Sequence, residues 1–74
     1  MKIPKDIENN FFDGLPTSKT KFGINAAVSI INGPHKQHNG SVISLITIEP
    51  NTKYLVELSV GTEVQIDELD LVPL

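Results

Sequence analysis

Turn residues interrupt the apolar runs of this chain so often that no long helix fits between them. From residue 24 onward, short apolar groups are separated by Asn32-Gly33-Pro34, Asn39-Gly40, Glu49-Pro50-Asn51 and Val60-Gly61. Gly and Asn tolerate a positive φ, and proline cannot donate to a β ladder, so these residues mark turns. No segment keeps a 3.6-residue apolar period for ten residues. The pattern therefore predicts an all-β chain.

Five short strands are predicted within residues 22–74, at about 24–31, 41–48, 54–58, 64–66 and 71–72. A turn at 49–52, a tight hairpin at Val60-Gly61 and one 3₁₀ turn at 67–69 join the later strands. Residues 42–48 alternate poorly, which is typical of a strand buried on both faces or bent by a bulge. The predicted fold class is a small five-stranded SH3-like barrel, because closing or curling a short sheet reduces its exposed edges.

Residues 1–21 lack a steady apolar period and contain the breakers Pro4, Gly14 and Pro16. They predict a flexible or loosely docked N-terminal arm ahead of a barrel at residues 22–74. Phe11 and Phe12 are the large apolar exception within this arm. Either the two rings pack over one open end of the core, or they contact another subunit or partner. Both interpretations remain open from the sequence.

The length and charge of the chain exclude several classes of protein. Its 74 residues make one domain at most, and they contain no cysteine for a disulfide, a thiolate nucleophile or a metal ligand. The composition is too polar for a membrane protein, and the cytosol is the expected compartment. The net charge is −3, there is no arginine, and residues 49–74 alone carry −5. Nucleic-acid binding is therefore disfavoured.

The loop at residues 32–40 carries the two histidines of the chain, but the residues of a catalytic site are missing. His35 and His38 lie three positions apart, with no cysteine and no nearby carboxylate, so solvated histidines are expected rather than a zinc site. No catalytic residue and no metal ligand is predicted. The exposed residues His35, Lys36, Gln37 and His38 are instead predicted to contact a protein or small-molecule partner.

Gly33 and Gly40 are two spaced glycines of this loop, and the apolar residue Val42 follows them. This arrangement resembles the motif of the KOW-type modules of ribosomal and transcription proteins. Gln37 stands where the motif has its middle glycine, and Lys36 is the only basic residue in the loop. The resemblance implies an RNA-associated module, which the absence of arginine disfavours.

A longer series of characteristic positions spans residues 22–72: Phe22-Gly23, Val28, Gly33, Gly40, Tyr54, Val56, Glu57, Gly61 and Val64-Gln65-Ile66. In order and spacing it resembles the type II dihydrofolate reductases, the plasmid-borne, trimethoprim-insensitive enzymes. The resemblance implies an SH3-like barrel that assembles as a homotetramer around a central pore, where NADPH and dihydrofolate stack. Gln65 and Ile66 would then line the pore and contact both ligands.

Two departures from that family argue against the reductase activity. Asp67 stands where the family has a tyrosine, and Ile30 stands where it has a lysine that helps to hold the anionic ligands. A symmetric pore would repeat Asp67 in every subunit, and these carboxylates would repel NADPH and dihydrofolate. The sequence therefore predicts the scaffold without a cofactor, and a divergent NADPH-dependent reductase is the alternative.

Self-association is the remaining prediction from the sequence. A chain this short has a thin core, and apolar residues on both faces of residues 42–48 leave surface that a monomer would expose. We therefore expect a non-catalytic, homo-oligomeric SH3-like binding module.

Overall fold

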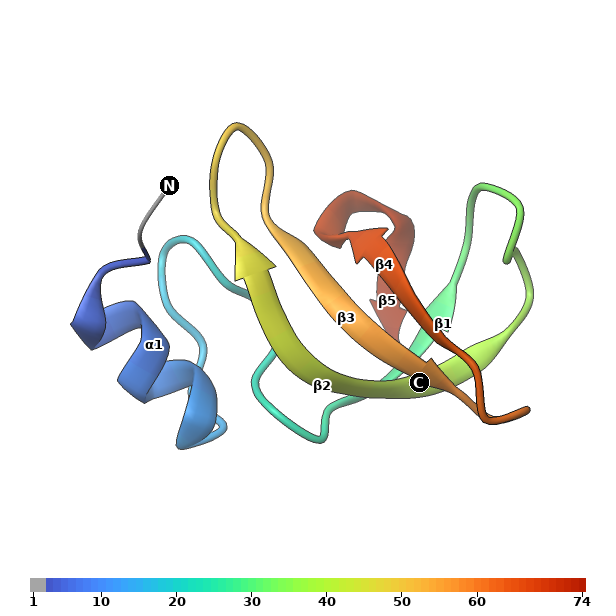
Figure 1. Ribbon diagram of the computed structural model, residues 1–74, viewed down its shortest axis with the longest axis horizontal. Coiled ribbons are helices and arrows are strands. Elements are labelled where there is room, and N and C mark those ends of the chain that lie inside the picture. Colours follow the sequence, from blue (N-terminus) through green and yellow to red (C-terminus); the bar gives the residue numbers. More distant parts are fainter. Residues whose placement is uncertain (1–2) are drawn as a thin grey trace.

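The computed structural model describes residues 3–74 as five strands with two short helical segments. Residues 1–2, which belong to the predicted arm, lie outside the described residues. The elements in chain order are α1 (Lys5–Phe12), β1 (Ala27–Ile30), β2 (Asn39–Thr47), β3 (Lys53–Leu58), β4 (Glu63–Asp67), the 3₁₀ turn η1 (Glu68–Asp70) and β5 (Leu71–Pro73) (Figure 1). The five predicted strands are confirmed, and the 3₁₀ turn lies one residue later than predicted.

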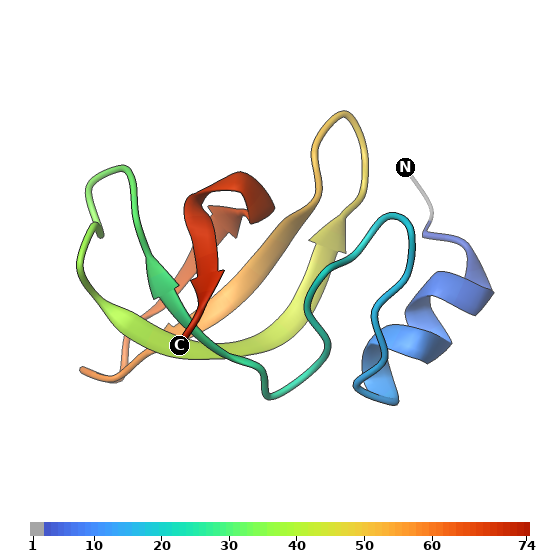
Figure 2. The same ribbon diagram turned by 180° about the vertical axis from the view of Figure 1, so that it is seen from behind.

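The strands form one antiparallel sheet in the order β4-β3-β2-β1-β5. The sheet is strongly curled, so that β1 and β5 lie behind β3 and β4, and the view from behind shows β5 beside β1 (Figures 1 and 2). It is barrel-like but not closed, because β4 and β5 remain the two ends of the strand order. The predicted all-β architecture is therefore confirmed as an open, curled sheet.

The bend of β2 produces the curl. Its pairing with β3 shifts register between Val42 and Ser44 and again between Leu45 and Thr47. Of the two alternatives that the sequence left open, these irregularities favour a strand bent by a bulge, and they explain why the apolar residues of this strand do not alternate. Gly40 is needed where the strand turns, because a Cβ there would collide with the backbone oxygen of Glu57.

The core lies inside the curl and is built by alternation along the strands. In β3, Tyr54 and Val56 are fully buried while Glu57 is exposed. The buried apolar cluster contains Phe11, Phe22, Val28, Ile30, Val42, Tyr54, Val56, Leu58, Ile66 and Leu71. Every strand contributes to it, so each strand depends on the others for its burial.

Helix α1 is the part of the fold that the sequence pattern does not predict. It spans eight residues, which is too short to show an apolar period over ten residues. Its residues are polar apart from Ile7 and the two phenylalanines. Asp6 and Glu8 lie in its first turn, where acidic side chains favour a helix. The helix covers one end of the curled sheet (Figure 1). No helix within residues 3–74 is long and apolar enough to cross a membrane.

The segment after α1 turns back and packs against the helix end. The backbone N–H of Ile24 donates to the carbonyl oxygen of Phe11 at 3.0 Å. Gly14 and Gly23 touch so closely that a Cβ on Gly23 would lie 2.5 Å from the Cα of Gly14. Residues 3–24 therefore form a compact cap in this structure, and the glycine pair allows the two segments to meet.

Candidate functional site

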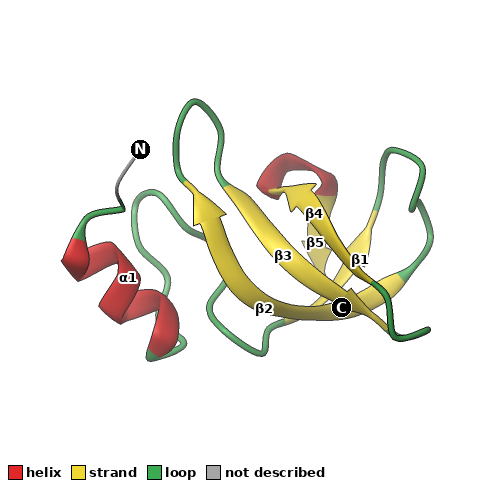
Figure 3. Ribbon diagram, in the orientation of Figure 1, coloured by secondary structure: helices red, strands yellow, loops and turns green. Residues whose placement is uncertain are grey.

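The loop between β1 and β2 is held in one shape by backbone hydrogen bonds. The N–H of Gln37 donates to the carbonyl oxygen of Ile30 at 2.8 Å, and the N–H of Ile30 donates to that of His38 at 2.9 Å. Lys36, Gln37 and His38 are exposed, while His35 is half-buried. The two imidazole rings lie 6.4 Å apart, edge to face. The four loop residues that were predicted to contact a partner therefore lie together, on the loop at the end of the sheet away from α1 (Figure 3).

Gln37 has a backbone conformation that usually belongs to glycine. Its φ is 76°, in the left-handed region. A residue with a Cβ is disfavoured there by about 1 kcal/mol or more. This is also the position that the KOW-type pattern fills with glycine. The chain keeps a long polar side chain here against that preference, and such local strain is concentrated at functional sites.

Gln65 and Ile66, the two predicted cofactor contacts, point to opposite faces of β4. Gln65 is exposed, whereas Ile66 is buried in the core at 8% exposure. Period-2 alternation requires this separation. Of these two residues, Gln65 is the one whose side chain is accessible to a ligand or to another subunit.

Asp67 has a cationic neighbour that the sequence analysis did not find. Lys53 Nζ lies 3.7 Å from Asp67 Oδ1, because the two residues face each other across β3 and β4. Both side chains are partly exposed, so the pair contributes little to stability. The lysine nevertheless offsets part of the charge that the sequence analysis counted against anionic ligands.

Phe11 and Phe12 are also separated by the structure. Phe11 is fully buried and stacks on Tyr54, with ring centroids 6.2 Å apart and planes at 24°. Phe12 is 56% exposed. Phe11 therefore packs over the end of the core, as the first interpretation stated, and presents no surface to a partner in this structure. Phe12 is the ring of this pair that remains accessible.

A hydrogen-bond network around Tyr54 joins the N-terminal cap to the sheet. Tyr54 Oη donates to Glu68 Oε2 at 2.5 Å and accepts from the N–H of Phe22 at 3.3 Å. The same carboxylate oxygen accepts from the N–H of Lys21 at 2.8 Å. Burial, reinforced by the hydrogen bond to Glu68, raises the pKa of Tyr54 well above its ordinary value, so the phenol remains a donor. Lys21 and Phe22 are far from Tyr54 and Glu68 in the sequence, so no local sequence pattern indicates these hydrogen bonds.

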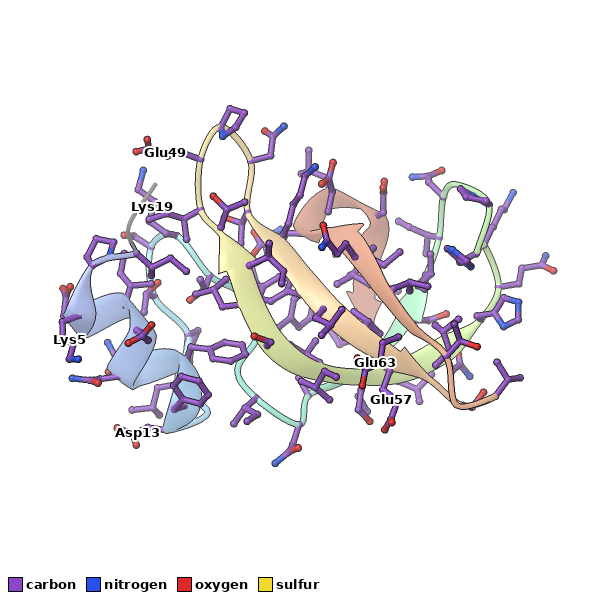
Figure 4. All side chains as sticks on the ribbon, in the orientation of Figure 1. Lys5, Asp13, Lys19, Glu49, Glu57 and Glu63 are labelled. Carbon is purple, nitrogen blue, oxygen red and sulfur yellow. The ribbon has the colours of Figure 1, made fainter. Side chains whose placement is uncertain are left out.

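A groove of about 460 Å³ runs across the outer face of the sheet, lined by residues that include Ala27, Ser41, Glu57 and Leu74. Three of its lining residues are paired in a row across β1, β2 and β3, Ala27 to Ser41 and Ser41 to Glu57. Glu57 is the charged residue of the lining. Its strand partner Glu63 lies beside the groove on β4, and Figure 4 shows the two carboxylates projecting from the same side of β3 and β4.

Other chemistry is sparse in the described part of the chain. Residues 3–74 contain no group of three or more His, Cys, Asp or Glu side chains placed to hold a metal ion. No buried side-chain nitrogen or oxygen among them lacks a hydrogen-bond partner. No protein-family model matches the chain, and no curated protein matches it. The two family resemblances of the sequence therefore stay predictions.

The conformation of Gln37 is tested by Gln37→Gly. We expect this change to raise the free energy of unfolding by up to about 1 kcal/mol, because glycine adopts a positive φ without strain. Lys36→Gly, one residue earlier, is the matched control and should lower it or leave it unchanged. Urea unfolding of the three proteins measures the effect, and equal changes in both variants would contradict the assignment of strain to Gln37.

The network around Tyr54 is tested by Tyr54→Phe. Removing the hydroxyl leaves the carboxylate of Glu68 without its phenol donor, and we expect a loss of about 1–3 kcal/mol of stability. Trypsin should also cut faster at Lys19 and Lys21, because the cap loosens. Ser59→Ala, an exposed change in the β3–β4 turn, is the control and should alter neither property. Wild-type stability and cleavage rates in Tyr54→Phe would show that the network does not hold the cap.

Proposed function

We propose that this chain is a non-catalytic, SH3-like binding module that associates with further copies of itself. The observation that carries this proposal is an apolar strip on the outer face of β1 and β5. Ile31, Val72 and Leu74 form the strip, and they are 40%, 37% and 70% exposed. An apolar surface at the end of an open sheet favours burial against another molecule.

The register of β1 and β5 supports placing these side chains on one face. Ile30 pairs with Leu71, and both are buried. Their neighbours Ile31 and Val72 therefore point outward. The pairing continues at both ends of the ribbon, where the N–H of Ile31 donates to Asp70 and the N–H of Leu74 donates to Ala27. The residues of the strip are therefore held by the backbone hydrogen bonds between β1 and β5.

The other edge strand of the sheet, β4, is less suited to association. Strand β4 carries Glu63 and Asp67, and two antiparallel copies of β4 centred on Gln65 would place these carboxylates against each other. The β1–β5 strip has no such repulsion. In a two-fold dimer the strip would face itself, as an isologous interface requires.

The loop of His35, Lys36, Gln37 and His38 would then serve a different partner. It begins directly after Ile31, so in a dimer built on the strip the loop of each copy lies next to the interface. Its polar side chains are exposed or half-buried, and the backbone hydrogen bonds described above hold them in place. We assign this loop surface to a protein or small-molecule partner, and we assign no catalytic role to it.

The self-association is tested with Val72→Lys. Light scattering at two concentrations should give wild-type masses above the 8.1 kDa of one chain, increasing with concentration. Val72→Lys should return the mass to that of a monomer, because a charge in the strip must be desolvated on association. Val60→Lys, at an apolar position that is 68% exposed in the β3–β4 turn, outside the strip, is the control and should associate like wild type. A wild-type monomer at high concentration would contradict the proposal.

A divergent NADPH-dependent reductase is the second candidate. The exposed Gln65 and the Lys53–Asp67 pair favour it, because an amide is available at β4 and part of the adjacent negative charge is offset. Under our proposal, titration with NADPH followed by fluorescence should show no saturable binding, and NADPH absorbance should not fall when dihydrofolate is added. Turnover that is lost in Gln65→Ala would establish the reductase instead and overturn the non-catalytic proposal.

A further inference from the structure

We propose that the outer edge of β4 binds an extended segment of another protein as an additional antiparallel strand, and that this segment carries a Lys or Arg side chain opposite Glu63. The proposal goes beyond self-association, because it concerns the end of the strand order opposite to β5. It rests on the backbone hydrogen-bonding groups along this edge, on a half-buried apolar side chain of β4 and on the charge of the strand.

The register of β3 and β4 directs backbone hydrogen-bonding groups to the outer edge of β4. The N–H of Leu58 donates to the carbonyl oxygen of Thr62 at 2.8 Å. Hydrogen-bonded pairs recur at every second residue of an antiparallel ladder, so the next residue bonded to β3 is Val64. The N–H and C=O groups of Glu63 and Gln65 therefore point away from β3. Within residues 3–74 no strand lies beyond β4 in the sheet, so these groups can pair with an added strand (Figure 1).

A second copy of this chain does not suit this edge. On β5, Pro73 has no N–H, and the N–H of Leu71 already donates to the carbonyl oxygen of Glu68. A second β4 would bring its carboxylates against those of the first, as described above. The same charges disfavour acidic partners and favour a strand of opposite charge. The edge therefore suits a basic segment from a different protein.

The side chains of β4 define the sequence that would fit. Glu63 and Glu57 are exposed and lie opposite each other, so a cation beside Glu63 would reduce their repulsion. Val64 is half-buried and packs against the core, and an apolar residue opposite it would cover its remaining surface. In an antiparallel strand, a polar residue opposite Gln65, an apolar residue and a basic residue would follow one another. Thr-Val-Lys is a sequence of this kind.

The probe for this proposal is a fluorescein-labelled peptide with the core Val-Thr-Val-Lys, in which Thr pairs with Gln65. Fluorescence anisotropy at low salt should show saturable binding that weakens as salt is added. Methylation of the Thr nitrogen removes the N–H that would donate to the carbonyl oxygen of Gln65, and we expect binding to weaken about tenfold or more. Methylation of the nitrogen of the following Val, which points away from β4, is the matched control and should change binding little.

Substitutions in β4 test the same contacts from the side of the protein. Gln65→Pro removes the N–H of the edge and should abolish binding, because proline fits an edge strand where its nitrogen faces solvent. Gln65→Thr keeps the N–H and should bind like wild type. Glu63→Lys should weaken binding of this peptide and favour a peptide with Glu in place of Lys. Circular dichroism of each variant checks that the sheet is intact.

Strand addition makes these results differ from those of charge attraction alone. Equal binding of the two methylated peptides would show that charge alone holds the peptide, and would overturn the proposal. Undiminished binding to Gln65→Pro, or no saturable binding by the wild-type protein, would overturn it as well. Val72→Lys should retain peptide binding, so a failure of self-association and a failure of the β4 edge are distinguished.

Discussion

The bend of β2 is the constraint on which the rest of the structure depends. This strand is the centre of the sheet, and its two register shifts turn the strands on either side toward each other. The turn lets Val28 and Leu71 share one core with Tyr54 and Val56. A flat sheet of this length would expose both faces of every strand, because residues 3–74 contain no second sheet to cover either face. The same bend leaves β4 and β5 apart, so the fold obtains its core while two sheet ends remain open.

The N-terminal cap covers one end of this curled sheet, and Tyr54 links the two. The ring of Tyr54 stacks on Phe11 and meets Phe22 edge to face, so it belongs to the core of both parts. Its hydroxyl connects Glu68 on η1 with the backbone before β1. The opposite end of the sheet has no such cover among residues 3–74, and there the structure displays its loop, its groove and its apolar strip.

The local sequence pattern was sufficient to predict the strands, but it did not predict which side chains the fold brings together. Alternation in residues 54–58 and 64–66, and its failure in residues 42–48, predicted β3, β4 and the irregular β2. Helix α1 was missed because one buried ring, Phe11, anchors it in place of an apolar period. The Glu57–Glu63 and Lys53–Asp67 pairs depend on strand register, which joins residues distant in sequence. The only sequence signal for the positive φ of Gln37 was that the KOW-type pattern has a glycine at this position.

We propose that two copies of this chain associate through the open end of the sheet formed by β1 and β5. The most direct test is an NMR dilution series of the ¹⁵N-labelled wild-type protein. Association through β1 and β5 predicts concentration-dependent amide shifts that cluster at residues 29–31 and 71–74, with little change along β4. Spectra that do not change with concentration, or shifts that cluster on β4, would contradict it.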